Sequence, residues 1–234
     1  MVKVFYDGTD MLRFAHHPLV VGFTTNTTIM RQSNQLCYQR FYETYVDQIK
    51  GRPISFQVFS DDSSTVREQA RMIRSISNHP IYVKVPVSNS TGETFLPVIL
   101  ELLEEEIPIN VTAVFTKEQI DLIYESLSLH KKATSAIVSI FGGRISDTGV
   151  EPKEIIRYAV ERFVTLPWVE ILWAGVKDNL ILQQCQEVGC HIATLPDAIM
   201  SRIDRIGQPL DDLSKDTVRS FLKDAVDGKL TITK

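Results

Sequence analysis

A lysine inside an apolar, strand-like run is the first residue of this sequence that could do chemistry. Lys84 lies in the middle of residues 81–87 and would share one strand face with Tyr82 and Pro86. Lysine is rarely buried unpaired, and burial lowers the pKa of its ammonium group. A neutral, buried amine can form a Schiff base with a carbonyl substrate. Two structural alternatives stay open: a lysine that reaches solvent from a strand edge, or one paired with Asp7.

Other polar residues also fall near the ends of apolar runs, where a buried parallel strand should be apolar throughout. They are Asp7, Thr25, Asn26, Gln57, Asn110, Thr112, Ser139 and Thr194. Enzymes with a (β/α)8 barrel build their active sites at the carboxyl ends of the strands, so this distribution favours an enzyme. The alternative is that hydrogen-bonded Ser, Thr and Asn side chains merely fill the barrel interior.

The elements that must position these residues alternate along the chain. Eight strand-like runs are separated by stretches with helical spacing of apolar residues. The runs are residues 2–7, 19–25, 54–59, 81–87, 107–115, 135–141, 169–174 and 191–195. The four residues from Thr116 to Gln119 read as a capping box at the start of one helix.

Eight such units in 234 residues predict an α/β fold, a (β/α)8 TIM barrel. An additional helix is expected at about residues 210–227, and residues 1–234 are expected to form a single domain. A doubly wound open sheet is the competing fold, but it uses a glycine-rich first turn, and Gly8-Thr9-Asp10 is not one.

Composition narrows the function classes. With 25 basic and 29 acidic residues the net charge is −4, which gives no basic excess to attract nucleic acid. No membrane span or signal peptide is evident, and Cys37, Cys185 and Cys190 are too few for a disulfide framework. A cytoplasmic protein is expected, with no nucleic-acid or membrane partner. No residue cluster has the spacing of a metal site, so neither a metal nor a cofactor is expected.

Ordered sequence blocks resemble those of the transaldolase family, in its small subfamily that includes the fructose-6-phosphate aldolases. The run Gly22-Phe23-Thr24-Thr25-Asn26 with Thr27-Thr28 resembles the signature Gly-Val-Thr-Thr-Asn-Pro-Ser. The other blocks are residues 83–87, 107–115, 139–147 and 192–196. Together they span nearly the whole chain in the family's order.

The resemblance implies catalytic roles. Lys84 would form an iminium ion with a ketose, and Asp7 would take the proton of the C4 hydroxyl during carbon–carbon cleavage. Thr112 would hold a proton-shuttling water. Gln57 stands where transaldolases carry a glutamate and the aldolases a glutamine.

The resemblance also implies substrate contacts. Asn26 and Asn110 would hydrogen-bond the dihydroxyacetone hydroxyls, with Thr25, Ser139 and Phe141 lining the site. Arg144 would bind the substrate phosphate, with Lys177 as a second cation; the structural alternative for Arg144 is a surface arginine near Asp147.

Several positions depart from the family pattern. Thr27 and Ile140 replace prolines, Gly175 stands where a phosphate-binding serine is usual, and Trp173 replaces a small residue. The loss of that hydroxyl bears directly on phosphate recognition and on the natural substrate.

The resemblance therefore implies a class I transaldolase that transfers a dihydroxyacetone unit between sugar phosphates in the pentose phosphate pathway, with fructose 6-phosphate as the expected donor. Phe141 and Asn110 favour this reaction, because the aldolases carry a tyrosine in place of Phe141. Gln57 favours the alternative, an aldolase that releases dihydroxyacetone. A third alternative is a non-catalytic sugar-phosphate-binding protein. The C-terminal helix resembles a subunit-packing segment, so a homo-oligomer, a pentamer or decamer, is expected.

Overall fold

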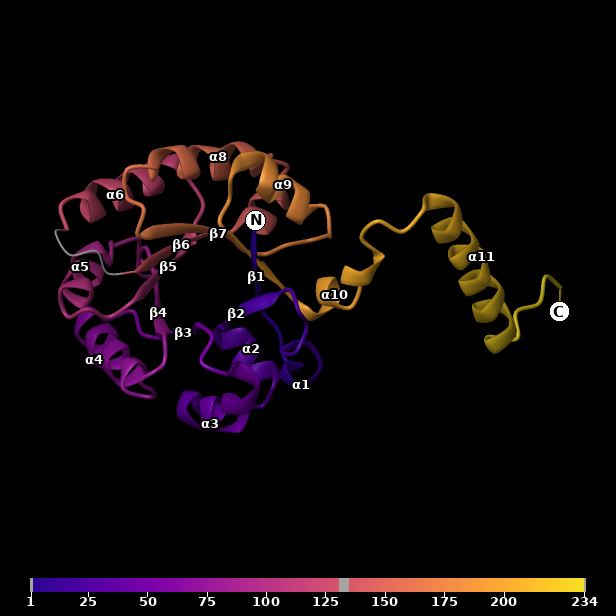
Figure 1. Ribbon diagram of the computed structural model, residues 1–234, viewed down its shortest axis with the longest axis horizontal. Coiled ribbons are helices and arrows are strands. Elements are labelled where there is room, and N and C mark those ends of the chain that lie inside the picture. Colours follow the sequence, from indigo (N-terminus) through magenta and orange to yellow (C-terminus); the bar gives the residue numbers. More distant parts are fainter. Residues whose placement is uncertain (1, 131–134, 234) are drawn as a thin grey trace. The chain divides into compact units, whose positions relative to one another are not determined.

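The computed structural model describes residues 2–130 and 135–233 of the chain. Within these residues, eight parallel strands close into a barrel in sequence order, with β8 next to β1 (Figure 1). The strands are β1 (Lys3–Tyr6), β2 (Val20–Thr24), β3 (Ile54–Gln57), β4 (Ile81–Pro86), β5 (Ile109–Val114), β6 (Ala136–Ile140), β7 (Val169–Trp173) and β8 (Ile192–Leu195). The predicted (β/α)8 barrel is confirmed.

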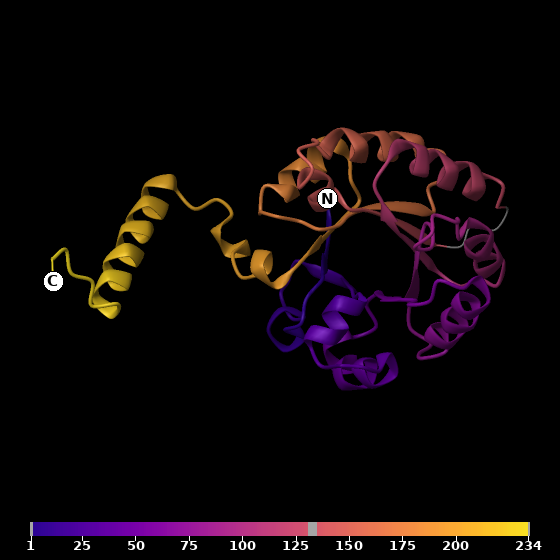
Figure 2. The same ribbon diagram turned by 180° about the vertical axis from the view of Figure 1, so that it is seen from behind.

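Helices surround the strands, as both ribbon views show (Figure 2). They are α1 (Met11–Phe14), α2 (Thr27–Gln32), α3 (Tyr38–Ile49), α4 (Ser63–Arg74), α5 (Leu96–Glu104), α6 (Lys117–Ser128), α7 (Gly142–Ser146), α8 (Lys153–Arg162), α9 (Ile181–Val188) and α10 (Asp197–Met200). Helix α4 buries Val66, Ala70 and Ile73, one stripe at helical spacing. The predicted capping box of α6 is present, with Thr116 and Gln119 exchanging hydrogen bonds.

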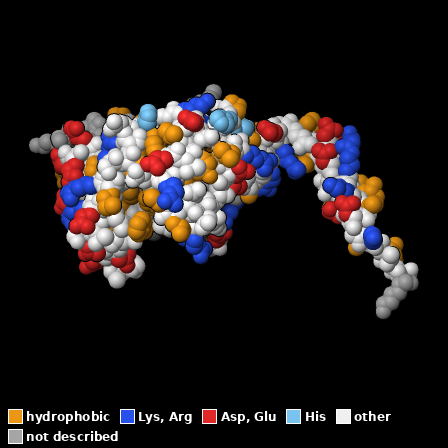
Figure 3. Space-filling view, turned by 90° about the horizontal axis from the view of Figure 1, so that it is seen from below, with side chains coloured by type: hydrophobic (Ala, Val, Ile, Leu, Met, Phe, Trp, Pro, Cys, Tyr) orange, Lys and Arg blue, Asp and Glu red, His pale blue; other side chains and the backbone are white. Residues whose placement is uncertain are grey.

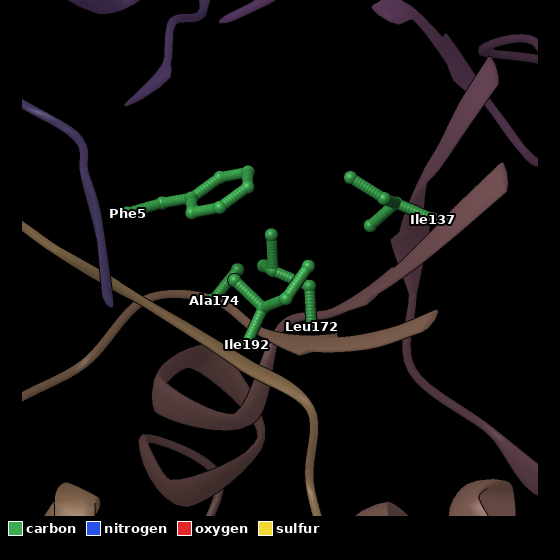
Figure 4. Packing of buried hydrophobic residues seen from close by; sticks show 5 residues of the cluster. All are labelled: Phe5, Ile137, Leu172, Ala174 and Ile192. Carbon is green, nitrogen blue, oxygen red and sulfur yellow. The ribbon is translucent and has the colours of Figure 1, made fainter. Parts of the chain in front are cut away.

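One layer of the barrel interior consists of apolar side chains from facing strands. Figure 4 shows Phe5 of β1 and Ile137 of β6 pointing toward one another, with Leu172, Ala174 and Ile192 beside them. Tyr82 and Phe141 pack against this cluster while remaining partly exposed. The cluster therefore forms an apolar layer on which Phe141 rests.

The chain divides into two compact units, residues 1–200 and 201–234. The second unit contains the short 3-10 helix Ile203–Arg205 and α11 (Leu210–Asp227), which matches the predicted C-terminal helix. Helix α11 buries none of its described side chains, and Phe221 is 68% exposed. Hydrophobic side chains lie beside charged ones along this segment in the space-filling view (Figure 3).

None of the helices in the described residues combines the length and the apolar character needed to cross a lipid bilayer.

Candidate active site

Lys84 of β4 lies inside the closed barrel and is 4% exposed. Its Nζ donates a hydrogen bond of 3.4 Å to the backbone oxygen of Thr25 and lies 5.8 Å from the centre of the Phe141 ring. Burial lowers the pKa of Lys84, and the nearby charge of Asp7 opposes that shift. An amine in these surroundings gives up its proton more easily than a surface lysine does.

Asp7 follows β1 and ends a chain of hydroxyl groups. Thr24 Oγ1 donates to Asp7 Oδ1 at 2.6 Å and lies 2.6 Å from Thr194 Oγ1. Because the single proton of Thr24 goes to Asp7, Thr194 must donate to Thr24. Burial raises the pKa of Asp7, while Lys84 and the Thr24 hydrogen bond lower it. The carboxyl group is thus fixed in place and disposed to hold a proton.

Thr112 of β5 lies close to Lys84 and Asp7, in the same part of the barrel. Its Oγ1 is buried and has no hydrogen-bond partner among the described residues. The next residue, Ala113, has φ 59°, and the pairing of β5 with β6 shifts register between Val111 and Val114. A positive φ at alanine is strained, and such strain often accompanies functional sites. The bulge distorts the strand directly beside Thr112.

A cavity of about 590 Å³ joins these groups at the carboxyl ends of the strands. The predicted site residues in its walls are Asp7, Asn26, Gln57, Lys84, Thr112, Phe141 and Arg144. Residues from widely separated parts of the sequence therefore meet around Lys84, at the barrel end where active sites are built.

Three other predicted residues lie outside the cavity walls, in a polar layer inside the barrel. Asn110 donates to Ser55 Oγ at 3.2 Å and accepts from Ser139 Oγ at 2.7 Å, and both Asn110 and Ser139 are buried. Thr25 donates its hydroxyl proton to the backbone oxygen of Ser55 at 2.8 Å. The polar groups of Asn110, Ser139 and Thr25 thus find hydrogen-bond partners within the barrel and support the strands that carry Lys84 and Thr112.

Asn26 and Gln57 occupy the cavity wall in different ways. Asn26 caps α2, and its Oδ1 accepts a hydrogen bond of 3.0 Å from the backbone of Ile29. Its Nδ2 is then the group with which it can donate to a ligand. Gln57 pairs in register with Lys84 across β3 and β4, which brings its amide beside the amine. Thr27, at a position where the resemblance leads one to expect proline, is the first residue of α2.

Phe141 and Arg144 also line the cavity wall. The Phe141 ring lies 5.6 Å from the ring of Phe115 and 5.7 Å from the guanidinium carbon of Arg144. Within the described residues, the Arg144 guanidinium group makes no hydrogen bond or ion pair. Arg144 can therefore bind an anion that enters the cavity without first releasing a carboxylate.

Lys177 is not brought to this cavity. It forms an ion pair of 3.2 Å with Asp147 and lines a separate hollow of about 160 Å³ together with Trp173. Gly175, by contrast, lies in the cavity wall with φ +72°. Its backbone approaches Gly143 so closely that a Cβ at Gly143 would lie 1.5 Å from Gly175 O.

Sequence reasoning missed Asp197, which directly follows Pro196 at the end of β8 and lies in the cavity wall. Its Oδ1 accepts a hydrogen bond from the Tyr6 hydroxyl, and its Oδ2 accepts from Thr9 N at 3.1 Å and Thr9 Oγ1 at 3.0 Å. The rule that singled out Asp7, an acidic residue just after a strand, could also have found Asp197.

In residues 2–130 and 135–233, no three His, Cys, Asp or Glu side chains group in a way that could hold a metal ion. What the site offers is a buried amine, a carboxyl group with a hydroxyl chain behind it, an unpartnered hydroxyl and a guanidinium group. This set can bind a phosphorylated carbonyl compound and move protons around an amine adduct.

Comparison with known proteins is consistent with this chemistry. The sequence profile described as Transaldolase/Fructose-6-phosphate aldolase matches residues 4–231. The chain is 31% identical over 215 residues to a probable transaldolase of Thermoanaerobacter sp., covering 90% of this chain and 92% of that one. It is 28% identical over 231 residues to a probable transaldolase of Clostridium kluyveri, covering 95% and 97%. A solved structure of a mandelate oxidase shares the fold alone. Its TM-score is 0.58 and its sequence identity 10%, and the match covers 82% of this chain and 61% of that one.

Proposed function

The chain belongs to the transaldolase/fructose-6-phosphate aldolase family, and on that premise we propose that it is a Schiff-base transaldolase. It would transfer a dihydroxyacetone unit from a ketose phosphate, fructose 6-phosphate in the first instance, to an acceptor aldehyde. The observation that supports this proposal best is the burial of the Lys84 amine in one cavity with Asp7 and Thr112.

The proposed reaction starts when the neutral Lys84 amine attacks the ketone carbon of the donor. Loss of water leaves an iminium ion at C2, which can accept the electron pair of the C3–C4 bond as an enamine. Asp7 takes the proton of the C4 hydroxyl, the bond breaks, and an aldehyde leaves. The enamine that stays on Lys84 then attacks the acceptor aldehyde, and water releases the new ketose. Thr112, with its unpartnered hydroxyl, would hold the water that carries protons between these steps.

Substrate binding is proposed to use the cavity wall. The Nδ2 of Asn26 would donate to a dihydroxyacetone hydroxyl, and Arg144 would bind the phosphate. Lys177 would join Arg144 only after exchanging Asp147 for the substrate. Asn110, Thr25 and Ser139 would act mainly by supporting the strand ends, because their polar groups bond within the barrel.

A second candidate, an aldolase that releases dihydroxyacetone, is favoured by one observation. Gln57 puts an amide, rather than a carboxylate, next to Lys84, as in the fructose-6-phosphate aldolases. Phe141 argues against it, since this wall offers a ring without a phenol to activate hydrolytic water. An assay with ketose phosphate alone separates the two, because only the aldolase accumulates dihydroxyacetone without an acceptor.

The experiment that tests the proposed mechanism is borohydride reduction in the presence of donor ketose, followed by peptide mass spectrometry. We expect a covalent adduct at Lys84 in the wild type and none in Lys84→Met. An adduct at another lysine, or no adduct with any ketose phosphate, would contradict the Schiff-base mechanism. Binding of sugar phosphate without an adduct or turnover would favour a non-catalytic binding protein.

The wider role that we propose is in the cytoplasmic pentose phosphate pathway, as a homo-oligomer. The exposed apolar side chains of α11 support association between copies, because such side chains are costly in water.

A further inference from the structure

The carboxylate of Asp197 holds the turn that follows Asp7. It accepts from the Tyr6 hydroxyl on one side of Asp7 and from the backbone and side chain of Thr9 on the other. The Tyr6 hydroxyl in turn accepts a hydrogen bond of 2.7 Å from the backbone of Asp10. Asp197 therefore connects the end of β8 to both flanks of the residue that is proposed to transfer the proton.

The fit between Asp197 and this turn leaves no spare space. A Cβ placed on Gly8, the residue next to Asp7, would lie 2.5 Å from Asp197 Oδ1 and 2.5 Å from the Tyr6 hydroxyl oxygen. The backbone of Asp7 is itself tied to β8, because its N–H donates to Leu195 O at 2.9 Å. The backbone on both sides of the Asp7 side chain is thus fixed by β8 and the residues that follow it.

Asp197 also contributes charge to the cavity. Among the described residues, the charged groups that line the cavity with Asp7 are Lys84 of β4, Arg144 of α7 and Asp197 of α10. Tyr6 stays neutral, because burial and the neighbouring Asp197 both raise the pKa of its hydroxyl group. Asp10 lies outside the cavity walls. Burial raises the pKa of Asp7 most; of its charged neighbours, Lys84 lowers this pKa and Asp197 raises it. The two neighbours therefore act on Asp7 in opposite directions.

We propose that Asp197 is a positioning residue for proton transfer: it fixes the turn that follows Asp7 through its hydrogen bonds with Tyr6 and Thr9. This inference rests on the proposed function, in which Asp7 takes the C4 hydroxyl proton. Asp197 has no reacting atom of its own in that scheme. Its effect should appear in carbon–carbon cleavage and not in the formation of the Lys84 adduct.

The test compares Asp197→Asn with Asp10→Asn, which removes one negative charge from the turn after Asp7 at a residue outside the cavity walls. For Asp197→Asn we expect kcat to fall about tenfold or more, a part of the contribution that acid–base groups make. The acidic limb of the kcat–pH profile should move to lower pH, because the charge that raises the pKa of Asp7 is gone. Borohydride trapping at Lys84 should remain at the wild-type level. Asp10→Asn should leave kcat and the profile unchanged.

The outcomes separate this inference from the proposed function. No wild-type adduct at Lys84 would overturn both. A wild-type adduct together with an unshifted profile in Asp197→Asn would overturn the positioning role alone. A higher KM at unchanged kcat in Asp197→Asn would assign Asp197 to substrate binding and would also overturn the positioning role.

Thr9→Val provides a milder second variant in case Asp197→Asn fails to fold. It removes the hydroxyl that donates to Asp197 but keeps the backbone N–H donor of residue 9 and the negative charge of Asp197. We expect a several-fold lower kcat with the acidic limb in its wild-type position. Unchanged kcat in a folded Thr9→Val protein would contradict the positioning of the turn by this hydrogen bond.

Discussion

Replacing Gly143 by alanine should separate two loops that the structure brings into backbone contact. The added Cβ would lie 1.5 Å from Gly175 O, whereas ordinary contacts begin near 3.4 Å. Because the obstacle is a backbone atom, no side-chain rotation can relieve it. The loops after β6 and β7 must move apart by about 2 Å, the difference between those distances.

The expected destabilisation has two physical sources. Separation of the loops breaks the bond from Gly143 N to Ala174 O, 3.3 Å long, which contributes about 1 kcal/mol. Overpacking adds about 1–3 kcal/mol. Gly143→Ala should therefore lower the free energy of unfolding by about 2–4 kcal/mol, equivalent to roughly 5–15 °C in Tm for a chain of this size. Arg144, the next residue, should move with the loop and raise KM for the phosphorylated donor.

Thermal and urea unfolding followed by circular dichroism would measure the loss, with steady-state kinetics for KM. Gly149→Ala is the matched control, since its φ is +81° but a Cβ there meets nothing within 4 Å. That variant should cost about 1 kcal/mol from backbone strain and leave KM unchanged. A Gly143→Ala protein within about 0.5 kcal/mol of wild type, the range of ordinary surface changes, would refute the close approach of the two loops.

Three further predictions concern other parts of the molecule. Phe141→Tyr should raise acceptor-free release of dihydroxyacetone, by about tenfold or more, because it adds a phenol near Lys84 that can activate water; Phe141→Leu, which adds none, should not. Asp7→Asn should abolish turnover yet stabilise the fold by about 0.5–2 kcal/mol at neutral pH. Burial raises the pKa of Asp7 in the folded protein above its unfolded value of 3.8. The wild type therefore loses folding stability when Asp7 is ionised; this loss is complete above the folded pKa and disappears below pH 3.8. Calorimetry should show that the unfolding free energies of wild type and Asp7→Asn converge as the pH falls. Phe221→Ser combined with Leu222→Ser should lower the mass measured by light scattering without changing the Tm of the barrel, and an unchanged mass would remove α11 from the proposed subunit contacts.

Local patterns were sufficient to predict the elements and the burial of Lys84. Continuous apolar runs specify buried parallel strands, and a lysine within such a run has no exposed face to occupy. The capping box at Thr116 is likewise a signal confined to four residues. These features depend on neighbours in sequence, which is why the sequence alone could predict them.

Contacts between distant residues could not be predicted in the same way. The hydrogen bond between Tyr6 and Asp197 joins residues 191 positions apart, and no pattern in the residues next to Asp197 indicates Tyr6 as its partner. Lys177 looked available beside Arg144, but the folded chain places Asp147 within 3.2 Å of its amine. The left-handed conformation of Ala113 is another example, since alanine gives no indication of a positive φ.

The pairing of β1 with β8 has a consequence for biosynthesis. Ribosomes add about 5–20 residues per second, so the first strand would wait on the order of 10–40 seconds for its last partner to be made. During that time Val4, Phe5 and Tyr6, all buried in the finished barrel, have an open edge that can pair with another chain. Asp7, which directly follows β1 and bonds through its N–H to Leu195 O, therefore reaches its final surroundings only after β8 has been made.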